Sequence, residues 1–190
     1  MTLGGIAPRL GATLGLSLLL TACASSLSSL PPLPESETGP YALGAGDRVR
    51  LQVFGQEELS REYLVSDSGT VTMPLIGSVE ASGRTLPAFE DGIEAKLRDG
   101  ILVDPNVTAE VIAYRPFYIL GETRAPGQYP YVPNMTVLTA VSMSGGFTFR
   151  AEEDQVSITR LVDGRMAEFR ADPLDFVVPG DVINVHERYF

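Results

Sequence analysis

The chain reads GDRVRLQV at residues 46–53, and this stretch sets the pattern for the rest of the fold. Val49, Leu51 and Val53 alternate with polar residues, a period of two that predicts a strand with one buried face. The Gly-Asp pair ahead of the strand is a turn signal, because both residue types favour tight turns. The sequence GDVINV at residues 180–185 repeats the pattern. We therefore expect a second strand launched by a Gly-Asp turn, with duplication and chance both open as its origin.

Short apolar segments separated by turn signals continue on both sides of this strand. We expect further strands at residues 63–65, 71–73, 79–83, 107–113, 117–120, 128–132, 156–162, 166–169 and 182–185. The turn at residues 67–69 predicts a hairpin between the first two of these strands. The Asp163-Gly164 pair predicts another hairpin, between residues 156–162 and 166–169.

Two segments have the pattern of helices. Thr85 is a good N-cap for a helix that Gly100 would end. The apolar stripe of this helix has spacings of three and four residues and consists of Leu86, Phe89, Ile93 and Leu97. A shorter helix is expected around residues 137–141, closed by Gly145 and Gly146. The predicted fold class is α+β, with two small domains that each place short mixed or antiparallel strands around one helix and meet near Tyr114.

The first residues are typical of a secretory leader. Residues 10–20 form an apolar run, LGATLGLSLLL, which is shorter than the roughly 20 residues that cross a bilayer as a helix. It fits the apolar region of a signal peptide. Leu20-Thr21-Ala22-Cys23 closely resembles a lipobox, where the cysteine thiol accepts a diacylglycerol. The alternative is an ordinary signal peptide that places its cysteine there by chance.

This interpretation defines the N-terminal organisation. Residues 1–22 are expected to be removed and Cys23 to carry the lipid, a stable anchor if it is acylated more than once. Residues 23–40 are rich in serine and proline, a composition that predicts an extended tether which buries no apolar surface. Ala24 follows the cysteine where an inner-membrane retention signal would have aspartate, so we expect the outer membrane, on the periplasmic side.

Composition limits the kinds of function. The chain has 190 residues, 44% of them hydrophobic, and a formal net charge of −10. No segment is rich in lysine and arginine, so we expect no nucleic-acid partner. With one histidine and a lipidated cysteine, neither a Ser-His-Asp triad nor a His/Cys zinc site is expected. We predict that the protein is not an enzyme, with no catalytic residue, cofactor or metal.

From Tyr41 onward the motifs resemble those of the bacterial outer-membrane polysaccharide export proteins (Wza-like). The resemblance covers nearly all of residues 41–190, and its motifs are YALGAGD at 41–47, VSDSGTVTMPLIG at 65–77, YRPFYILGE at 114–122, PGQY at 126–129, the segment 136–148 and PGDVI at 179–183. It implies an export domain at residues 41–113 and a β-grasp-like SLBB (soluble ligand-binding β-grasp) domain at 114–190. The positions matching family motifs, as structural residues or as contacts to a subunit or sugar, are Gly46, Asp47, Arg115, Pro116, Gly121, Glu122, Pro126, Gly127, Gly145 and Gly146.

The resemblance also implies partners. These are further copies of the chain in a ring around an export channel, an inner-membrane polysaccharide co-polymerase and the polysaccharide itself. Long members continue into further SLBB domains and a pore-forming C-terminal helix, whereas this chain stops after a strand at Phe190. We therefore expect a short member that needs a separate outer-membrane β-barrel pore.

Several residues have two open interpretations. Arg115 and Glu122 frame one predicted strand and are either subunit or sugar contacts or a solvated pair at the strand ends. The rings of Tyr114, Tyr118, Tyr129 and Tyr131 either stack on sugars or, more commonly, pack on the sheet. The acidic residues 152–154 are typical of a solvated loop, since a glycosidase holds two carboxylates across a cleft. His186 is more typical of the surface than of a metal ligand or base.

The expected function is that of an outer-membrane lipoprotein in a capsular or exopolysaccharide export machine, forming an oligomeric conduit or gate. The alternative is a glycan-binding envelope lipoprotein that forms no conduit. A cell-envelope carbohydrate enzyme is the third hypothesis, and it would need a catalytic carboxylate.

Overall fold

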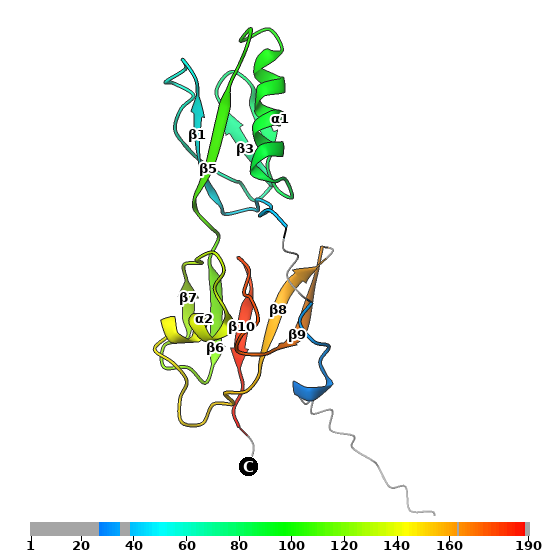
Figure 1. Ribbon diagram of the computed structural model, residues 1–190, viewed down its shortest axis with the longest axis vertical. Coiled ribbons are helices and arrows are strands. Elements are labelled where there is room, and N and C mark those ends of the chain that lie inside the picture. Colours follow the sequence, from blue (N-terminus) through cyan, green and yellow to red (C-terminus); the bar gives the residue numbers. More distant parts are fainter. Residues whose placement is uncertain (1–26, 35–38, 163, 189–190) are drawn as a thin grey trace, which may run out of the picture.

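The computed structural model describes residues 27–34, 39–162 and 164–188, and it has two separate hydrophobic cores stacked end to end (Figure 1). The first core is formed by residues between Leu43 and Val107, and the second by residues between Phe117 and Val185. Two helices and several small, mostly antiparallel sheets confirm the predicted α+β class. None of the described helices is long and apolar enough to span a bilayer.

The first domain is built around β1 (Arg48–Val53). It lies between β2 (Glu62–Leu64) and β5 (Val107–Ala113), and both pair with it antiparallel. A separate hairpin joins β3 (Thr70–Met73) to β4 (Gly77–Glu80). The alternation predicted for β1 is confirmed, because Val49, Leu51 and Val53 are buried while the residues between them are exposed.

The helix α1 (Leu86–Arg98) covers this core as its sequence predicts. The Thr85 side chain accepts from the amide of Ala88, and the helix buries Phe89, Ile93 and Leu97. The helix also protects an exposed sheet edge. The carboxylates of Glu90 and Glu94 accept from the amides of Ala109 (2.6 Å) and Val107 (3.0 Å). These amides belong to β5, on the side that no other described strand covers.

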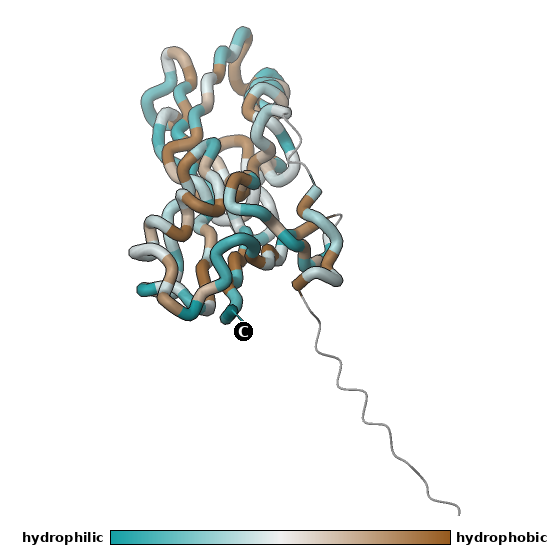
Figure 2. Tube along the Cα trace, turned by 60° about the horizontal axis from the view of Figure 1, so that its bottom comes forward, coloured by the Kyte–Doolittle hydropathy of each residue, from teal (hydrophilic) through white to brown (hydrophobic). Residues whose placement is uncertain are grey.

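The second domain is a five-stranded sheet with the order β7-β6-β10-β8-β9. Its strands are β6 (Phe117–Gly121), β7 (Gly127–Tyr129), β8 (Val156–Val162), β9 (Arg165–Ala171) and β10 (Val182–Val185). The central pair, β6 and β10, is parallel and the other pairs are antiparallel. The helix α2 (Val137–Met143) packs Val137, Ala140 and Val141 into the core on one side of the sheet. Figure 2 shows hydrophobic and hydrophilic stretches alternating along the chain in both domains.

Two expected features of the sheets differ from the structure. The hairpin between residues 63–65 and 71–73 is wrong, because β2 pairs with β1 while β3 pairs with β4 across the turn after Met73. The turn at residues 67–69 is present, but it passes the chain from one sheet to the other. The strand expected at 128–132 ends at Tyr129, because Pro130 has no amide to continue a ladder. The hairpin of β8 and β9 is confirmed.

The expectation of an extended tether at residues 23–40 that buries no apolar surface is wrong at residues 31–33. The amide of Leu33 donates to the carbonyl of Arg170 (2.7 Å), and the amide of Arg170 donates to the carbonyl of Pro31 (2.8 Å). Leu33 packs partly buried against the second core. A serine- and proline-rich segment therefore docks where a sheet edge offers it backbone partners and an apolar contact.

We expect Phe89→Ala to lower the free energy of unfolding by about 3–5 kcal/mol, because a fully buried phenylalanine would leave a cavity in the first core. Urea unfolding followed by circular dichroism measures the loss. Val103→Ala is the control, since Val103 is 98% exposed, and its effect should stay within about 0.5 kcal/mol. Equal effects of the two substitutions would show that α1 does not support the core.

Candidate functional site at the domain junction

The two domains meet at Arg115, whose groups bond to residues of both. Its backbone amide donates to Asp47 Oδ1 (2.8 Å), and its Nη1 donates to the Tyr41 hydroxyl (2.8 Å). On the other side its Nε donates to the carbonyl of Pro179 (3.0 Å). Asp47 and Tyr41 belong to the first domain and Pro179 to the second. One side chain thus bonds the start of β1 to the turn before β10.

Asp47 is the buried charge at the centre of this junction, with 0% of its surface exposed. Its Oδ2 accepts from the Tyr41 hydroxyl (2.6 Å) and from the amide of Gly44 (2.8 Å), and it lies 3.4 Å from Arg115 Nη1. A buried carboxylate is tolerated only where donors replace its lost water. Burial and the bond to Asp47 together raise the pKa of Tyr41, so the tyrosine stays a hydroxyl donor.

Glycines let the Arg115 guanidinium fit between the domains. A Cβ at Gly44 would lie 2.1 Å from Arg115 Nη1, and a Cβ at Gly180 would lie 3.2 Å from Arg115 Nε. Gly180 also has a φ of +92°, where L-residues with side chains are strained. Gly44 and Gly180 come from different domains, so the close approach of Arg115 is built from both sides.

The turn before β10 repeats the turn before β1. The Asp181 side chain accepts from the amide of Val178, three residues earlier (2.9 Å), as Asp47 accepts from Gly44. Arg160 binds Asp181 with two nearly parallel bonds of 2.9 and 2.7 Å. Burial raises the pKa of the Asp181 carboxyl, and the Arg160 guanidinium acts in the opposite direction. The sequence echo between residues 46–51 and 180–185 is therefore a shared turn that buries an arginine-paired aspartate.

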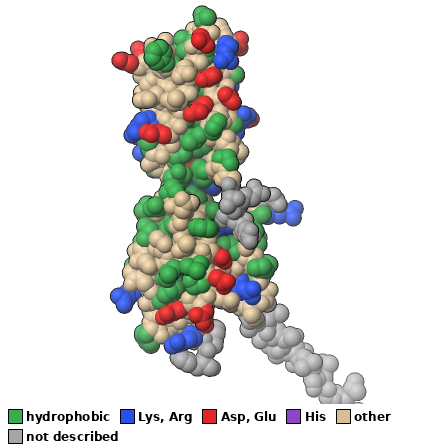
Figure 3. Space-filling view, viewed as in Figure 1, with side chains coloured by type: hydrophobic (Ala, Val, Ile, Leu, Met, Phe, Trp, Pro, Cys, Tyr) green, Lys and Arg blue, Asp and Glu red, His purple; other side chains and the backbone are tan. Residues whose placement is uncertain are grey.

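A groove of about 820 Å³ lies beside this junction. Tyr41, Tyr114 and Tyr131 line it as a chain of edge-to-face rings, with centroid distances of 4.9 and 5.4 Å. Arg160 and Phe176 line it from the second domain. Figure 3 shows hydrophobic side chains gathered at the waist between the two domains. The groove combines aromatic surface with a guanidinium, the kind of lining that suits a polar ligand with apolar faces.

The other motif residues lie at the far end of the second domain. Gly121 ends β6 with a φ of +83°, and a Cβ there would lie 2.0 Å from the carbonyl of Val185. The Glu122 carboxylate accepts from the Thr148 hydroxyl (2.6 Å). The backbone of residues 124–125 bonds to the turn that contains Gly145 and Gly146. Pro126 directly precedes β7, and Gly127 is its first residue. These residues shape loops, and the structure brings none of them to the junction.

Of the two interpretations left open for Arg115 and Glu122, the solvated pair at the strand ends does not fit the structure. Glu122 is at the opposite end of β6, and Arg115 instead pairs with Asp47, with 31% of its side chain exposed. Gly46 and Pro116 do join Arg115 at the junction. Gly46 has a φ of +94° beside the Arg115 side chain, and the carbonyl of Pro116 accepts from the amide of Gly180 (3.0 Å).

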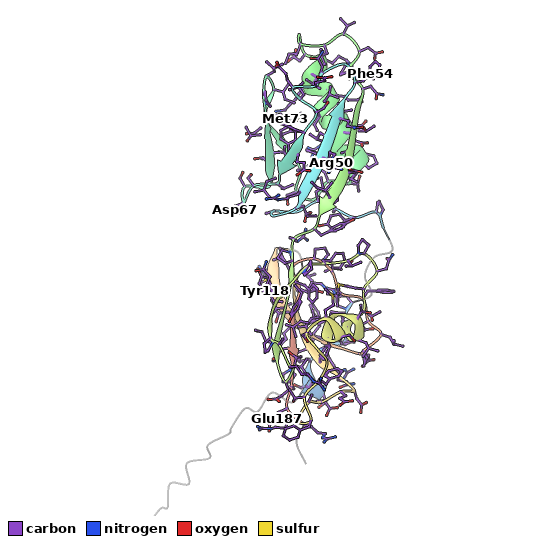
Figure 4. All side chains as sticks on the ribbon, turned by 90° about the vertical axis from the view of Figure 1, so that its left-hand side faces the viewer. Arg50, Phe54, Asp67, Met73, Tyr118 and Glu187 are labelled. Carbon is purple, nitrogen blue, oxygen red and sulfur yellow. The ribbon has the colours of Figure 1, made fainter. Side chains whose placement is uncertain are left out.

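The tyrosines divide into packed and exposed rings. Tyr114 and Tyr131 pack edge to face in the groove beside the junction. Tyr129 packs on Phe117, with a centroid distance of 6.0 Å, and its hydroxyl donates to the carbonyl of Ala125. Tyr118 is 41% exposed on the other face of the sheet (Figure 4). Packing is thus the observed state of three of the four rings, and Tyr118 keeps a face open to solvent.

Neither of the remaining candidates has the geometry of a catalytic group. Glu153 and Asp154 are exposed. His186 is half-buried, and its Nε2 lies 2.8 Å from the hydroxyl of Ser157, whose 1% exposure leaves no access for a substrate. Within the described ranges, no three His, Cys, Asp or Glu residues form a metal-binding group. Cys23 and the leader at residues 1–22 lie outside the described residues.

Sequence reasoning missed the partners of the two buried aspartates. Asp47 stood out as a motif residue, but Tyr41, Gly44 and Arg115 were not recognised as its partners in space. The Gly-Asp echo marked Asp181, whereas nothing in the sequence pairs it with Arg160, because the two are 21 residues apart.

Two family models match the chain, and the boundary between their matches falls next to Arg115 at the domain junction. Residues 35–112 match the family model described as polysaccharide biosynthesis/export protein, and residues 116–170 match the SLBB domain. The chain is also similar to the exopolysaccharide production protein ExoF of Rhizobium meliloti (strain 1021), with 36% identity over 149 residues. That match covers 72% of this chain and 34% of ExoF. The chain therefore spans about a third of the length of this curated relative.

We expect Asp47→Ala to lower the free energy of unfolding by about 3–5 kcal/mol, because it leaves the backbone amides of Gly44 and Arg115 and the Tyr41 hydroxyl without their acceptor. Urea unfolding is the measurement. Glu110→Ala is the matched control, since Glu110 also pairs with an arginine, Arg50, but on an exposed strand face, and a much smaller loss is expected there. Similar losses for both variants would contradict a central role for the junction.

Proposed function

The chain belongs to the polysaccharide biosynthesis/export protein family, and from this premise we propose that it is a component of an exopolysaccharide export machine. In this proposal it acts as a conduit or gate that guides the polymer and performs no chemistry on it. The observation that carries the proposal is the junction itself. An export domain and an SLBB domain follow one another and are joined through Asp47, Arg115 and Pro179.

The absence of chemistry is supported by the carboxylates that the structure describes. Asp47 and Asp181 are buried and committed to arginines. Most exposed acids with printed contacts pair with nearby arginines, as Glu80 does with Arg84. A glycosidase holds two carboxylates across a cleft within reach of one bond of the sugar, and the described acidic residues offer no such pair at the junction groove.

Assembly into a ring is supported by two different apolar surfaces on the second domain. The open sheet face, opposite α2, carries exposed Tyr118, Leu120, Leu161 and Met166. A second surface, on the side of α2, carries exposed Leu138, Leu174 and Phe176. Two unlike patches favour head-to-tail contacts, which close into rings when the rotation allows it. We name these patches the open-face patch and the helix-face patch.

The remaining parts of the proposal concern location and partners. We place the protein at the outer membrane, facing the periplasm and held by a lipid on Cys23, with an inner-membrane co-polymerase as the protein that delivers the polymer. A glycan-binding lipoprotein without a conduit is the second candidate, and the tyrosine-lined groove beside Arg115 favours it.

Export is tested by deleting the gene and measuring secreted polysaccharide in the culture medium. We expect secretion to be lost on deletion and restored by the unaltered chain, but not by Cys23→Ser, which cannot accept the lipid. Equal expression of both chains is checked on a blot. Normal secretion in the deletion strain would reject the export role, and full rescue by Cys23→Ser would reject the anchor alone.

The head-to-tail arrangement is tested with two double variants and native mass spectrometry. Leu161→Glu with Met166→Glu removes the open-face patch, and Leu138→Glu with Leu174→Glu removes the helix-face patch. Each variant alone should be monomeric, whereas an equal mixture should give a heterodimer, because each partner supplies the patch that the other lacks. An isologous contact would instead let one variant dimerise alone, and a monomeric unaltered chain would reject the ring.

A further inference from the structure

The groove beside the junction is lined by an arginine whose guanidinium the protein uses only in part. Arg160 is 7% exposed and lines the groove. Its Nε and Nη2 donate to the Asp181 carboxylate, and its Nη2 also donates to the carbonyl of Phe176 (2.9 Å). None of the described residues accepts a hydrogen bond from its Nη1. Because every guanidinium nitrogen carries N–H donors, Nη1 is left for a ligand in the groove.

A second polar group comes from a turn at the same groove. Pro133 and Asn134 both line the groove, and the amide of Met135 donates to the carbonyl of Val132 across them (3.3 Å). Asn134 has a φ of +63°. Proline followed by a residue with positive φ is the pattern of a type II turn, in which asparagine is tolerated. The Asn134 side chain is exposed, so its amide is free to donate and accept at the groove.

Three tyrosines supply the apolar part of the lining. Tyr41, Tyr114 and Tyr131 are each half-buried and meet edge to face. Rings that meet in this way do not cover one another's faces as stacked rings would, so aromatic surface remains for the C–H groups of a ligand. A hexose unit has C–H groups on its faces and hydroxyls on its rim. It therefore matches an aromatic lining with a few polar groups beside it.

The charges at the groove favour an uncharged ligand. Arg115 and Arg160 both line it, and each faces a buried aspartate of the protein, Asp47 or Asp181. Their positive charges are therefore already balanced. The described lining contains no lysine, and the chain has a formal net charge of −10. An anionic sugar would gain little from this lining, whereas a hydroxyl needs only a donor or an acceptor.

We propose that the groove binds a segment of uncharged glycan, with a hexose ring against the tyrosines and its hydroxyls bonded to Arg160 Nη1 and the Asn134 amide. The volume of the groove, about 820 Å³, lies within the roughly 300–1,000 Å³ of typical ligand sites. Because Tyr41 belongs to the first domain and Arg160 to the second, the glycan contacts both sides of the junction. This inference rests on the proposed function, which brings the chain into contact with a polysaccharide.

Binding is measured by isothermal titration calorimetry on the full chain, purified in a detergent without a sugar headgroup. The probes are cellotetraose, maltotetraose, mannotetraose and galactotetraose, with tetragalacturonate as the acidic counterpart. At least one uncharged probe should bind, with the same affinity at low and high salt, and tetragalacturonate should bind more weakly than the best of them. Failure of every uncharged probe to bind would overturn the proposal. Tighter binding of tetragalacturonate would overturn the choice of an uncharged glycan.

The polar contact is tested with Asn134→Gly, which removes the amide side chain while glycine keeps the positive φ. Its thermal unfolding midpoint should stay unchanged, and its affinity for the best probe should fall by about threefold to tenfold, the effect of one lost hydrogen bond. Gln128→Ala is the matched control, because it removes an amide from an exposed position in β7, outside the groove. Equal affinities of the two variants would overturn the contact with Asn134.

The aromatic contact is tested with Tyr131→Leu, which keeps an apolar side chain and removes the ring. The affinity should fall several-fold, whereas Tyr118→Leu, the same change outside the groove, should bind as the unaltered chain does. Equal losses in both variants would overturn the groove as the place of binding. No binding by the unaltered chain, together with lost secretion on gene deletion, would reject the site alone. Binding together with normal secretion would reject the export role alone.

Discussion

A single buried carboxylate, that of Asp47, constrains how the two domains meet. Because this carboxylate is buried, hydrogen-bond donors of the protein must replace its hydration. These donors come from the first domain and from the backbone at the start of the second. Arg115 adds a bond to Pro179 on the far side. A change in the relative position of the domains would break several of these bonds at once. The junction therefore holds the two modules in one arrangement.

The same turn, in which a buried aspartate pairs with an arginine, occurs twice in the chain and makes different connections. Asp47 and Asp181 each follow a glycine with positive φ, accept from the amide three residues before and face an arginine. The first pair joins two domains, while the second ties the turn before β10 to β8 within one domain. Both turns lie at the junction, because β1 and β10 begin there and run away from it in opposite directions (Figure 1). The Gly-Asp pattern thus precedes, in each domain, the strand that begins at the junction.

This arrangement has consequences for the proposed role in export. A fixed junction gives each copy of the chain a defined long axis, which a ring of copies requires if its wall is to be regular. Residues 31–33 also bond to the edge of β9 in the second domain. Among the described residues, most of the exposed large apolar side chains belong to the second domain.

The sequence by itself determined the elements: the alternation in residues 48–53, the stripe of α1 with its Thr85 cap, and the hairpin at β8 and β9 all follow from local periodicity and turn chemistry. It also identified Gly46, Asp47 and Arg115 as positions that match family motifs. Only the tertiary structure decided which strands pair, that Arg115 bonds to Asp47 and not to Glu122, and that residues 31–33 dock on β9. These contacts join residues that are distant along the chain, and their formation depends on burial and on unpaired backbone groups that exist only once the sheets have formed.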